Sequence, residues 1–167
     1  PYGFPQPSQY AKLAAGKQYA VYSAPSDTSF RAANGKALLS TNDWVQVFFE
    51  EDGYLLVQYA ISRHQYRIGY IKADAVSNLS EVAEIGSWAN YPAQVLRTSA
   101  ITDDPLNSCG AVMTLTAGQQ VTYLGQLGQE WAFVETTTAQ GQRIRGFVEL
   151  SELNVTRPDD ADDNLNG

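Results

Sequence analysis

The chain has 167 residues, of which 44% are hydrophobic, and its aromatic residues number 10 Tyr, 6 Phe and 3 Trp, a composition that excludes a disordered chain. Its 11 basic and 18 acidic residues give a formal net charge of −7, which disfavours nucleic acid and anionic membranes as partners. Many glycines, prolines and β-branched or aromatic side chains favour strands and turns, so we expect an all-β protein.

The first segment, residues 1–16, is Pro-rich and then Ala-rich. It has neither an initiator methionine nor a signal peptide, so the chain reads as a piece of a longer mature protein. We expect these residues to form an extended arm that docks on the module formed by residues 17–77. Since no stretch of the sequence approaches about 18 uninterrupted apolar residues, we expect no membrane insertion.

Residues 17–77 have the pattern of a small module of about five short strands. Alternation at Val45, Val47 and Phe49 predicts a strand with one buried face, and the acidic-Gly sequence at 51–53 predicts the turn at its end. The next strand-to-strand stretch, residues 60–67, is long and contains His64, the only histidine.

Residues 78–92 form the expected linker. Leu79, Val82, Ile85 and Trp88 recur at a spacing of three, which predicts either a short helix or a packed linker. In both cases we expect Trp88 to be buried between the flanking modules.

Residues 93–154 repeat the first module. An offset of 76 pairs Leu39 with Leu115 and Val47 with Tyr123. After one inserted residue an offset of 77 pairs Tyr54 with Trp131, Gly69 with Gly146 and Tyr70 with Phe147. The turn between the corresponding strands is expected at residues 125–128, which begin and end with glycine. The sequence therefore predicts one small architecture used twice.

Residues 155–167 form an acidic tail, expected to be a mobile linker. The alternation of Asp160, Asp162, Asn164 and Asn166 is similar to the oxygen ligands of a calcium loop. However, Leu165 stands where such a loop requires glycine, so we interpret the tail as solvated and expect no metal.

The motifs VYSAPS, NGKALLSTNDWVQVF, DGYLLVQY and RIGYI of the first copy resemble the bacterial Src-homology-3-like family. TDDPLNS, LTAGQQVTYL, QEWAFVE and RGFVELSEL repeat the pattern in the second copy. This resemblance implies two tandem SH3-like small barrels in an exported or cell-envelope protein, with recognition of peptidoglycan or another wall component. The Asn-Val-Arg that commonly comes after the first loop of the family is absent from both copies.

Barrels of this class present a groove between the first long loop and the middle hairpin, lined by aromatic side chains and a few polar groups. The candidate lining residues in the first copy are Tyr22, Phe30, Arg31, Trp44, Tyr54 and Tyr70. Tyr54 and Tyr70 are aromatic in both copies, which a shared core explains. Trp44 and Phe30 have no aromatic counterpart, so they are the stronger candidates for binding.

No catalytic arrangement stands out. The only Cys–His pair is Cys109 and His64, which lie in different copies without a setting that would activate a thiolate. Asp103 and Asp104 before Pro105 could be ligands but are ordinary turn chemistry, and we interpret them as a turn. We expect no enzyme activity and no cofactor.

Two non-catalytic functions remain open from the sequence. In the first, the chain is a binding or targeting module for a cell-wall glycan or peptide. In the second, it is a structural spacer or protein–protein interaction unit of a larger surface protein. A hydrolase that uses Cys109 is a third possibility, which unchanged activity after Cys109→Ala would dismiss.

Overall fold

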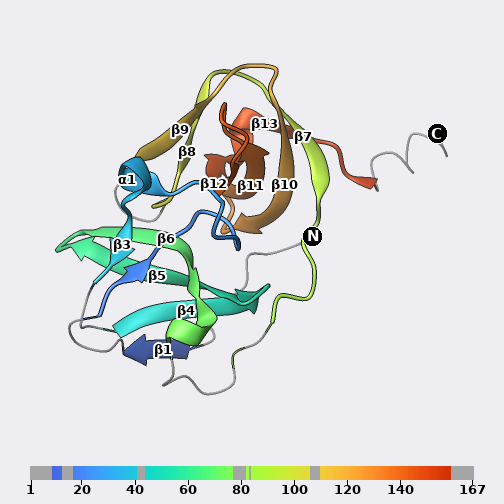
Figure 1. Ribbon diagram of the computed structural model, residues 1–167. Coiled ribbons are helices and arrows are strands. Elements are labelled where there is room, and N and C mark those ends of the chain that lie inside the picture. Colours follow the sequence, from blue (N-terminus) through green and yellow to red (C-terminus); the bar gives the residue numbers. More distant parts are fainter. Residues whose placement is uncertain are drawn as a thin grey trace.

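The computed structural model describes residues 9–12, 17–40, 44–76, 82, 84–105 and 110–158. In this part of the chain the structure is all-β, as expected, and its helices are short (Figure 1). The strands are β1 (Gln9–Lys12), β2 (Tyr19–Ala20), β3 (Leu38–Leu39), β4 (Trp44–Glu51), β5 (Tyr54–Ser62), β6 (Gln65–Lys72), β7 (Tyr91–Val95), β8 (Ser99–Thr102), β9 (Ala111–Leu115), β10 (Gln120–Leu127), β11 (Trp131–Thr137), β12 (Arg143–Glu149) and β13 (Leu153–Val155). The helices are α1 (Ala32–Gly35), η1 (Ala73–Ala75) and η2 (Leu150–Glu152).

Residues 9–76, here called the N-terminal half, form a four-stranded antiparallel sheet in the order β1-β4-β5-β6 and the small pair β2-β3. β1, from the expected arm, pairs with β4. The long stretch at 60–67 is the end of a hairpin, because β5 continues to Ser62 and β6 begins at Gln65. Tyr22 pairs with Tyr70 in an isolated bridge, which ties the first loop to β6.

Residues 91–155, the C-terminal half, form one sheet in the order β13-β7-β10-β11-β12-β8-β9. The described part of the chain thus holds six strands in the N-terminal half and seven in the C-terminal half, where about five per copy were expected. The additional strands are β1, from the arm, and in the C-terminal half β7, which pairs with β10 as β1 pairs with β4, and β13, which pairs with β7 at the sheet edge. Both sheets are open in strand order.

The central hairpin is built in the same way in both halves. The β4–β5 register shifts between Val47 and Phe49, and the β10–β11 register shifts between Tyr123 and Gly125, so each first strand carries a bulge at the same place. β4 pairs with β5 across a two-residue turn, whereas Leu127 pairs with Trp131 across three residues. The residue inserted between the copies therefore lies in this turn.

The turn expected at residues 125–128 is wrong in its position. β10 continues to Leu127, and the turn occupies residues 128–130. A bulge absorbs an extra residue while the strand goes on, so Gly125 is accommodated within β10.

The glycines in the Gly-aromatic motifs at the end of each copy are required for the same steric reason. A Cβ on Gly69 would lie 2.5 Å from Val21 Cγ1 and 3.3 Å from the Tyr22 carbonyl oxygen. A Cβ on Gly146 would collide with Ile101 Cγ2 and lie 3.0 Å from the Thr102 carbonyl oxygen. Glycine therefore lets residues 21–22 approach β6 closely in the N-terminal half, and lets β8 approach β12 closely in the C-terminal half.

The buried hydrophobic side chains form three clusters: one inside each half and one between them. The third cluster, called the seam below, joins β4, β5 and β6 to β10, β11 and β12. Its buried members are Phe48, Phe49, Leu56, Ile68, Tyr70, Leu124, Phe133 and Phe147.

The linker, expected as a short helix or a packed segment, forms no helix over residues 84–90, where its regular pairing is a bridge between Glu84 and Glu50. Its backbone bonds to the two halves instead of to itself: the Ile85 N–H donates to Glu50 O at 3.0 Å, and the Ala89 N–H donates to Leu124 O at 2.9 Å. Ile85 and Trp88 pack against the seam. Val82 packs against the cluster inside the N-terminal half, and Leu79 lies outside the described residues. The apolar spacing of three thus reflects a packed segment, one of the two expected forms, and no helix.

Candidate functional site

Three of the expected groove residues meet at one place, here called the aromatic corner: Tyr22, Arg31 and Tyr54. The Tyr22 and Tyr54 rings lie edge to face, with centroids 5.8 Å apart and an interplanar angle of 81°. The Arg31 guanidinium carbon lies 5.3 Å from the Tyr22 ring centroid. All three side chains are half-buried: Tyr22 and Tyr54 pack in part against the seam, and part of each side chain remains open to solvent.

The aromatic corner is held by backbone contacts. Arg31 Nε donates to Val21 O at 3.2 Å and Nη2 donates to Ala37 O at 2.7 Å, which fixes the guanidinium against Tyr22. Burial, followed by the charge of Asp27, raises the pKa of Tyr54 above its ordinary value. The Tyr54 hydroxyl is therefore neutral at physiological pH and available as a hydrogen-bond donor.

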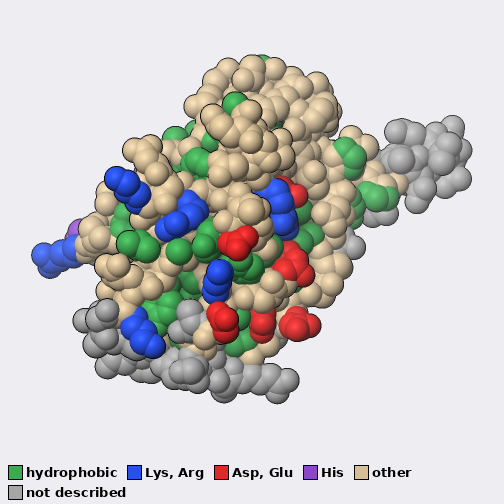
Figure 2. Space-filling model, viewed as in Figure 1, with side chains coloured by type: hydrophobic (Ala, Val, Ile, Leu, Met, Phe, Trp, Pro, Cys, Tyr) green, Lys and Arg blue, Asp and Glu red, His purple; other side chains and the backbone are tan. Residues whose placement is uncertain are grey.

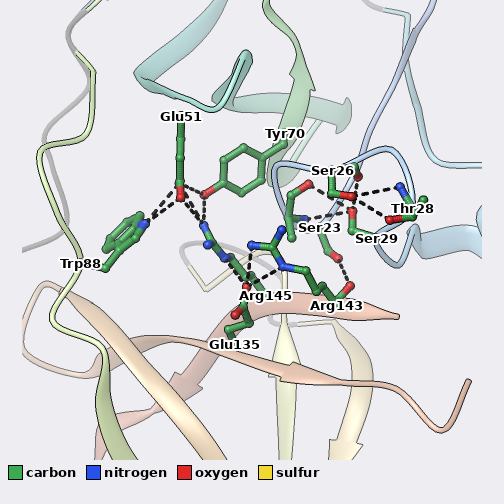
Figure 3. A network of polar contacts seen from close by, with 11 residues as sticks. Ser23, Ser26, Thr28, Ser29, Glu51, Tyr70, Trp88, Glu135, Arg143 and Arg145 are labelled. Carbon is green, nitrogen blue, oxygen red and sulfur yellow. Dashed lines mark hydrogen bonds and ion pairs between the residues drawn. The ribbon is translucent and has the colours of Figure 1, made fainter. Parts of the chain in front are cut away.

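Phe30 lies beside this corner and faces the other half. Its backbone N–H donates to Arg143 O at 2.8 Å, and its side chain is half-buried. The preceding loop is stiffened by hydroxyl contacts that Figure 3 shows: Ser29 Oγ donates to Ser26 O at 2.7 Å, and Ser26 and Thr28 share a 2.8 Å bond. Phe30 is thus at the joint between the halves rather than on an isolated surface.

Tyr70 does not line an open groove. Its side chain has 0% exposure and belongs to the seam, because the C-terminal half covers the face that the sequence assigned to a ligand. Burial raises the pKa of its hydroxyl well above the ordinary value. Tyr70 is therefore a structural residue, in keeping with the shared core suggested by its partner Phe147 in the repeat.

Trp44 is not at the aromatic corner. Its backbone pairs with Lys12 at the start of β4, whereas Glu51, at the end of that strand, pairs with Tyr54. Seven residues of strand separate the two positions, roughly 23 Å at about 3.3 Å per residue. The side chain of Trp44 lies outside the described part of the structure.

The strongest polar arrangement is centred on Arg145, from β12, and is here called the Arg145 network (Figure 3). Arg145 Nη1 donates to Glu51 Oε1 at 2.9 Å and to the Tyr70 hydroxyl at 2.9 Å, and its Nε donates to Glu135 Oε1 at 2.9 Å. The Tyr70 hydroxyl in turn donates to Glu51 Oε1 at 3.0 Å. These bonds link the two halves through an arginine that is 6% exposed.

Trp88 completes the joint from the linker. Its ring centroid lies 5.4 Å from that of Phe49, in the N-terminal half, and 5.4 Å from that of Phe133, in the C-terminal half. Its indole Nε1 donates to both Glu51 carboxylate oxygens at 3.2 Å. Trp88 lies between the halves as expected, although it is half-buried rather than fully enclosed.

The turn at 103–105 has a docking role that the sequence did not reveal. The Ile68 N–H, on β6, donates to Asp103 O at 2.8 Å, and the Tyr66 N–H donates to Asp104 Oδ2 at 3.3 Å. Arg67 Nε lies 3.5 Å from Asp103 Oδ2. The turn at 103–105 thus accepts hydrogen bonds from backbone N–H groups of β6 and joins the C-terminal half to the edge of the N-terminal sheet.

No reactive cluster is visible in the described residues. His64 is exposed in the β5–β6 turn, and Cys109 lies outside the described residues. The described part holds no group of three or more His, Cys, Asp or Glu side chains arranged for a metal ion. Within the same residues, no helix has the length and apolarity needed to cross a membrane.

The surface carries charges of both signs. Figure 2 shows acidic side chains gathered toward the lower right of one face and basic side chains mostly to the left, with hydrophobic side chains between them. Among the described residues, the large hydrophobic side chains with high exposure are Leu38, Ile61 and Leu96, which come from separate segments. The aromatic corner therefore remains the one predicted binding feature with its side chains grouped.

The residues of the Arg145 network carry a signal in the repeat. At the offset of 77, Arg145 corresponds to Ile68, and at the offset of 76, Glu51 corresponds to Leu127. A charge in one copy therefore stands where the other copy has an apolar side chain, at two positions that prove to be paired. Asp103 and Asp104 carry no comparable signal, because turn chemistry explains them.

Comparison with known proteins gives distant likenesses. No protein-family model matches the sequence, and the search of curated proteins finds no match. The chain is similar to the solved structure of NlpC2 from Trichomonas vaginalis, with 12% identity and a TM-score of 0.34, over 88% of this chain and 47% of that one. It is also similar to NlpC1 from the same organism, with 14% identity and a TM-score of 0.32, over 93% of this chain and 49% of that one. The chain spans about half the length of these two proteins.

Proposed function

We propose that the chain is a non-catalytic binding or targeting unit of a bacterial secreted or cell-envelope protein. In this proposal, two SH3-like small barrels pack face to face, and the unit recognises peptidoglycan or a related wall component. The aromatic corner is the observation that carries the proposal. The internal repeat, with its matching bulges and closing glycines, supports the duplication of one small architecture.

The chemistry of the aromatic corner suits a glycan–peptide ligand. The half-buried faces of Tyr22 and Tyr54 offer flat apolar surface with hydroxyl tips, which favours contact with sugar rings and short peptides. Arg31, fixed against Tyr22 by two backbone carbonyls, places a cation beside these rings that can attract a carboxylate. The C-terminal half covers Tyr70 and leaves this corner accessible, so we place the site on the N-terminal half.

Sedimentation with purified peptidoglycan tests the proposal. Tyr54→Ala should weaken binding by about tenfold, since a ring at the centre of a small site is worth roughly 1.4 kcal/mol. Tyr54→Phe should retain most binding, because the ring face remains. Tyr91→Ala removes a half-buried tyrosine from the C-terminal half and serves as the matched control. Absence of wall binding by the unaltered protein at low salt would reject the proposal.

A second function is a structural spacer or protein–protein interaction unit in a larger surface protein. The Arg145 network favours it, because a buried guanidinium bonded to carboxylates of both halves resists bending between them. This function predicts no sedimentation with cell walls and a rigid particle in small-angle scattering. The wall-binding assay therefore separates the two functions.

A further inference from the structure

A small cavity lies at the joint between the halves. Its volume is about 20 Å³, which is room for about one water molecule. Tyr22, Phe30 and Tyr59 line it from the N-terminal half, and Asp103 and Arg145 line it from the C-terminal half. Its lining is more apolar than polar, and the side chains in it that can hydrogen-bond a buried water include those of Tyr59, Asp103 and Arg145.

Tyr59 supplies an unsatisfied polar group to this cavity. The residue is 2% exposed, and its hydroxyl has no hydrogen-bond acceptor in the described part of the chain. Burial raises the pKa of this hydroxyl to about 12, against the opposing charge of Arg67 and a hydrogen bond from that side chain, so the hydroxyl stays protonated. Since Arg67 can only donate, the hydroxyl proton still needs an acceptor. A buried hydroxyl proton without an acceptor is costly, which makes a partner in the adjoining cavity favourable.

Asp103 lines the same cavity from the C-terminal half. Arg67 from β6, Tyr59 from β5, the neighbouring Asp104 and Arg145 from β12 are the titratable or charged groups around its carboxyl. Burial raises the pKa of Asp103 to about 6, and the attraction of Arg67, at 3.5 Å, opposes this rise without cancelling it. The carboxyl therefore retains a proton more readily when it is docked than when it is exposed.

We propose that the Asp103 carboxyl and the Tyr59 hydroxyl share one buried water molecule in this cavity, and that the halves dock most tightly when Asp103 carries a proton. The protonated carboxyl gives the water both a donor and an acceptor next to the Tyr59 hydroxyl. The joint is thus a proton-binding site, and mild acid closes it.

The direction in which docking changes with pH follows from the difference between the docked and the ordinary pKa of Asp103. The pKa of docked Asp103, about 6, lies above the ordinary value of 3.8. At a pH between these two values, opening of the joint therefore releases a proton. Docking is therefore strongest below the lower value and weakens as pH rises through about 6. Between pH 7.5 and pH 5 the docking equilibrium should strengthen by up to about tenfold.

Amide hydrogen exchange of Ile68 measures this opening, because its N–H donates to Asp103 O across the joint. After correction for the intrinsic exchange rate, the protection factor of this amide in the unaltered protein should be about three to ten times higher at pH 5 than at pH 7.5. A protection factor that is equal or lower at pH 5 would overturn the proposal.

Three variants test the separate contributions of the Asp103 carboxyl and the Tyr59 hydroxyl. Asp103→Asn should bring the ratio of the two protection factors close to one, whereas Asp74→Asn, at an exposed acid in η1, should leave it unchanged. Tyr59→Phe should lower the protection at pH 5 several-fold, because the water loses a partner. A higher protection in Tyr59→Phe would mean that the hydroxyl was orphaned, and would reject the shared water.

A measurement on the unaltered protein keeps the proposal testable if Asp103→Asn fails to fold. Carbon-detected NMR of the side-chain carboxyl records the titration of Asp103 directly. A midpoint near 6 supports the proposal, and a midpoint below about 4.5, close to the ordinary value, overturns it.

Discussion

Arg145 Nη1 lies 2.9 Å from Glu51 Oε1 and 3.1 Å from Glu51 Oε2, so one nitrogen of the C-terminal half bridges both carboxylate oxygens of a residue in the N-terminal half. The two side chains are 5% and 11% exposed. At this burial an ion pair is costly to break from one side, because the remaining charge has little water to solvate it.

Arg145→Ala should therefore destabilise the protein strongly. The change leaves the Glu51 carboxylate without its cation and removes one of the two cations at Glu135, for an expected loss of about 3–5 kcal/mol in the free energy of unfolding. Urea denaturation measures the loss as a lower midpoint. Arg143→Ala is the matched control, because Arg143 also pairs with Glu135 but its side chain is 40% exposed. Its cost should be about 1 kcal/mol or less, and equal losses in the two variants would contradict this account.

Tyr70→Phe should cost about 1–3 kcal/mol, because the hydroxyl both donates to Glu51 and accepts from Arg145 inside the seam. The ring packing stays, so the fold should be unchanged by circular dichroism. The variant also tests whether Tyr70 belongs to a ligand groove. We expect wall binding to be as strong as in the unaltered protein once both are folded, and a selective loss of binding would return Tyr70 to the site.

Trp88→Phe and Trp88→Ala separate two contributions of the linker. The phenylalanine retains an aromatic ring between Phe49 and Phe133 but loses the indole N–H bond to Glu51, for an expected cost of about 1 kcal/mol. The alanine also loses the ring, and we expect a cost of about 3 kcal/mol. Thermal or urea unfolding gives both values. Similar costs for the two variants would show that the ring contributes little to the joint.

The features that could be predicted from the sequence are those with a local or repeated pattern. The all-β class is indicated by composition. The register of the repeat makes Val47 and Tyr123 equivalent positions, and each lies next to the bulge of its own hairpin. The closing glycines, Gly69 and Gly146, were recognisable because the same motif recurs. Each of these depends on residues near one another in the chain or on a comparison of two copies.

The seam could not be predicted in this way, because it depends on how two finished surfaces meet. Tyr70 satisfies the pattern of a groove residue and of a core residue equally, and only the position of the C-terminal half decides between them. Asp104 bonds to Tyr66 across 38 positions of sequence, with nothing in the local turn to indicate the partner. The spacing of the linker was compatible with a helix and with a packed segment, and only the surfaces against which Val82, Ile85 and Trp88 lie decide for the packed segment.

The closing glycines give the last prediction. Gly69→Ala places a methyl group 2.5 Å from Val21 Cγ1, so residues 21–22 and β6 must separate or Val21 must move, and we expect a loss of about 1–3 kcal/mol. Adding Val21→Ala should recover part of this loss, because it removes the atom in the way. Gly86→Ala, where a Cβ meets nothing within 4 Å, should be nearly neutral. A double-mutant cycle from urea unfolding measures the coupling. If Gly69→Ala and Val21→Ala are simply additive, the close approach is not the reason that this position requires glycine.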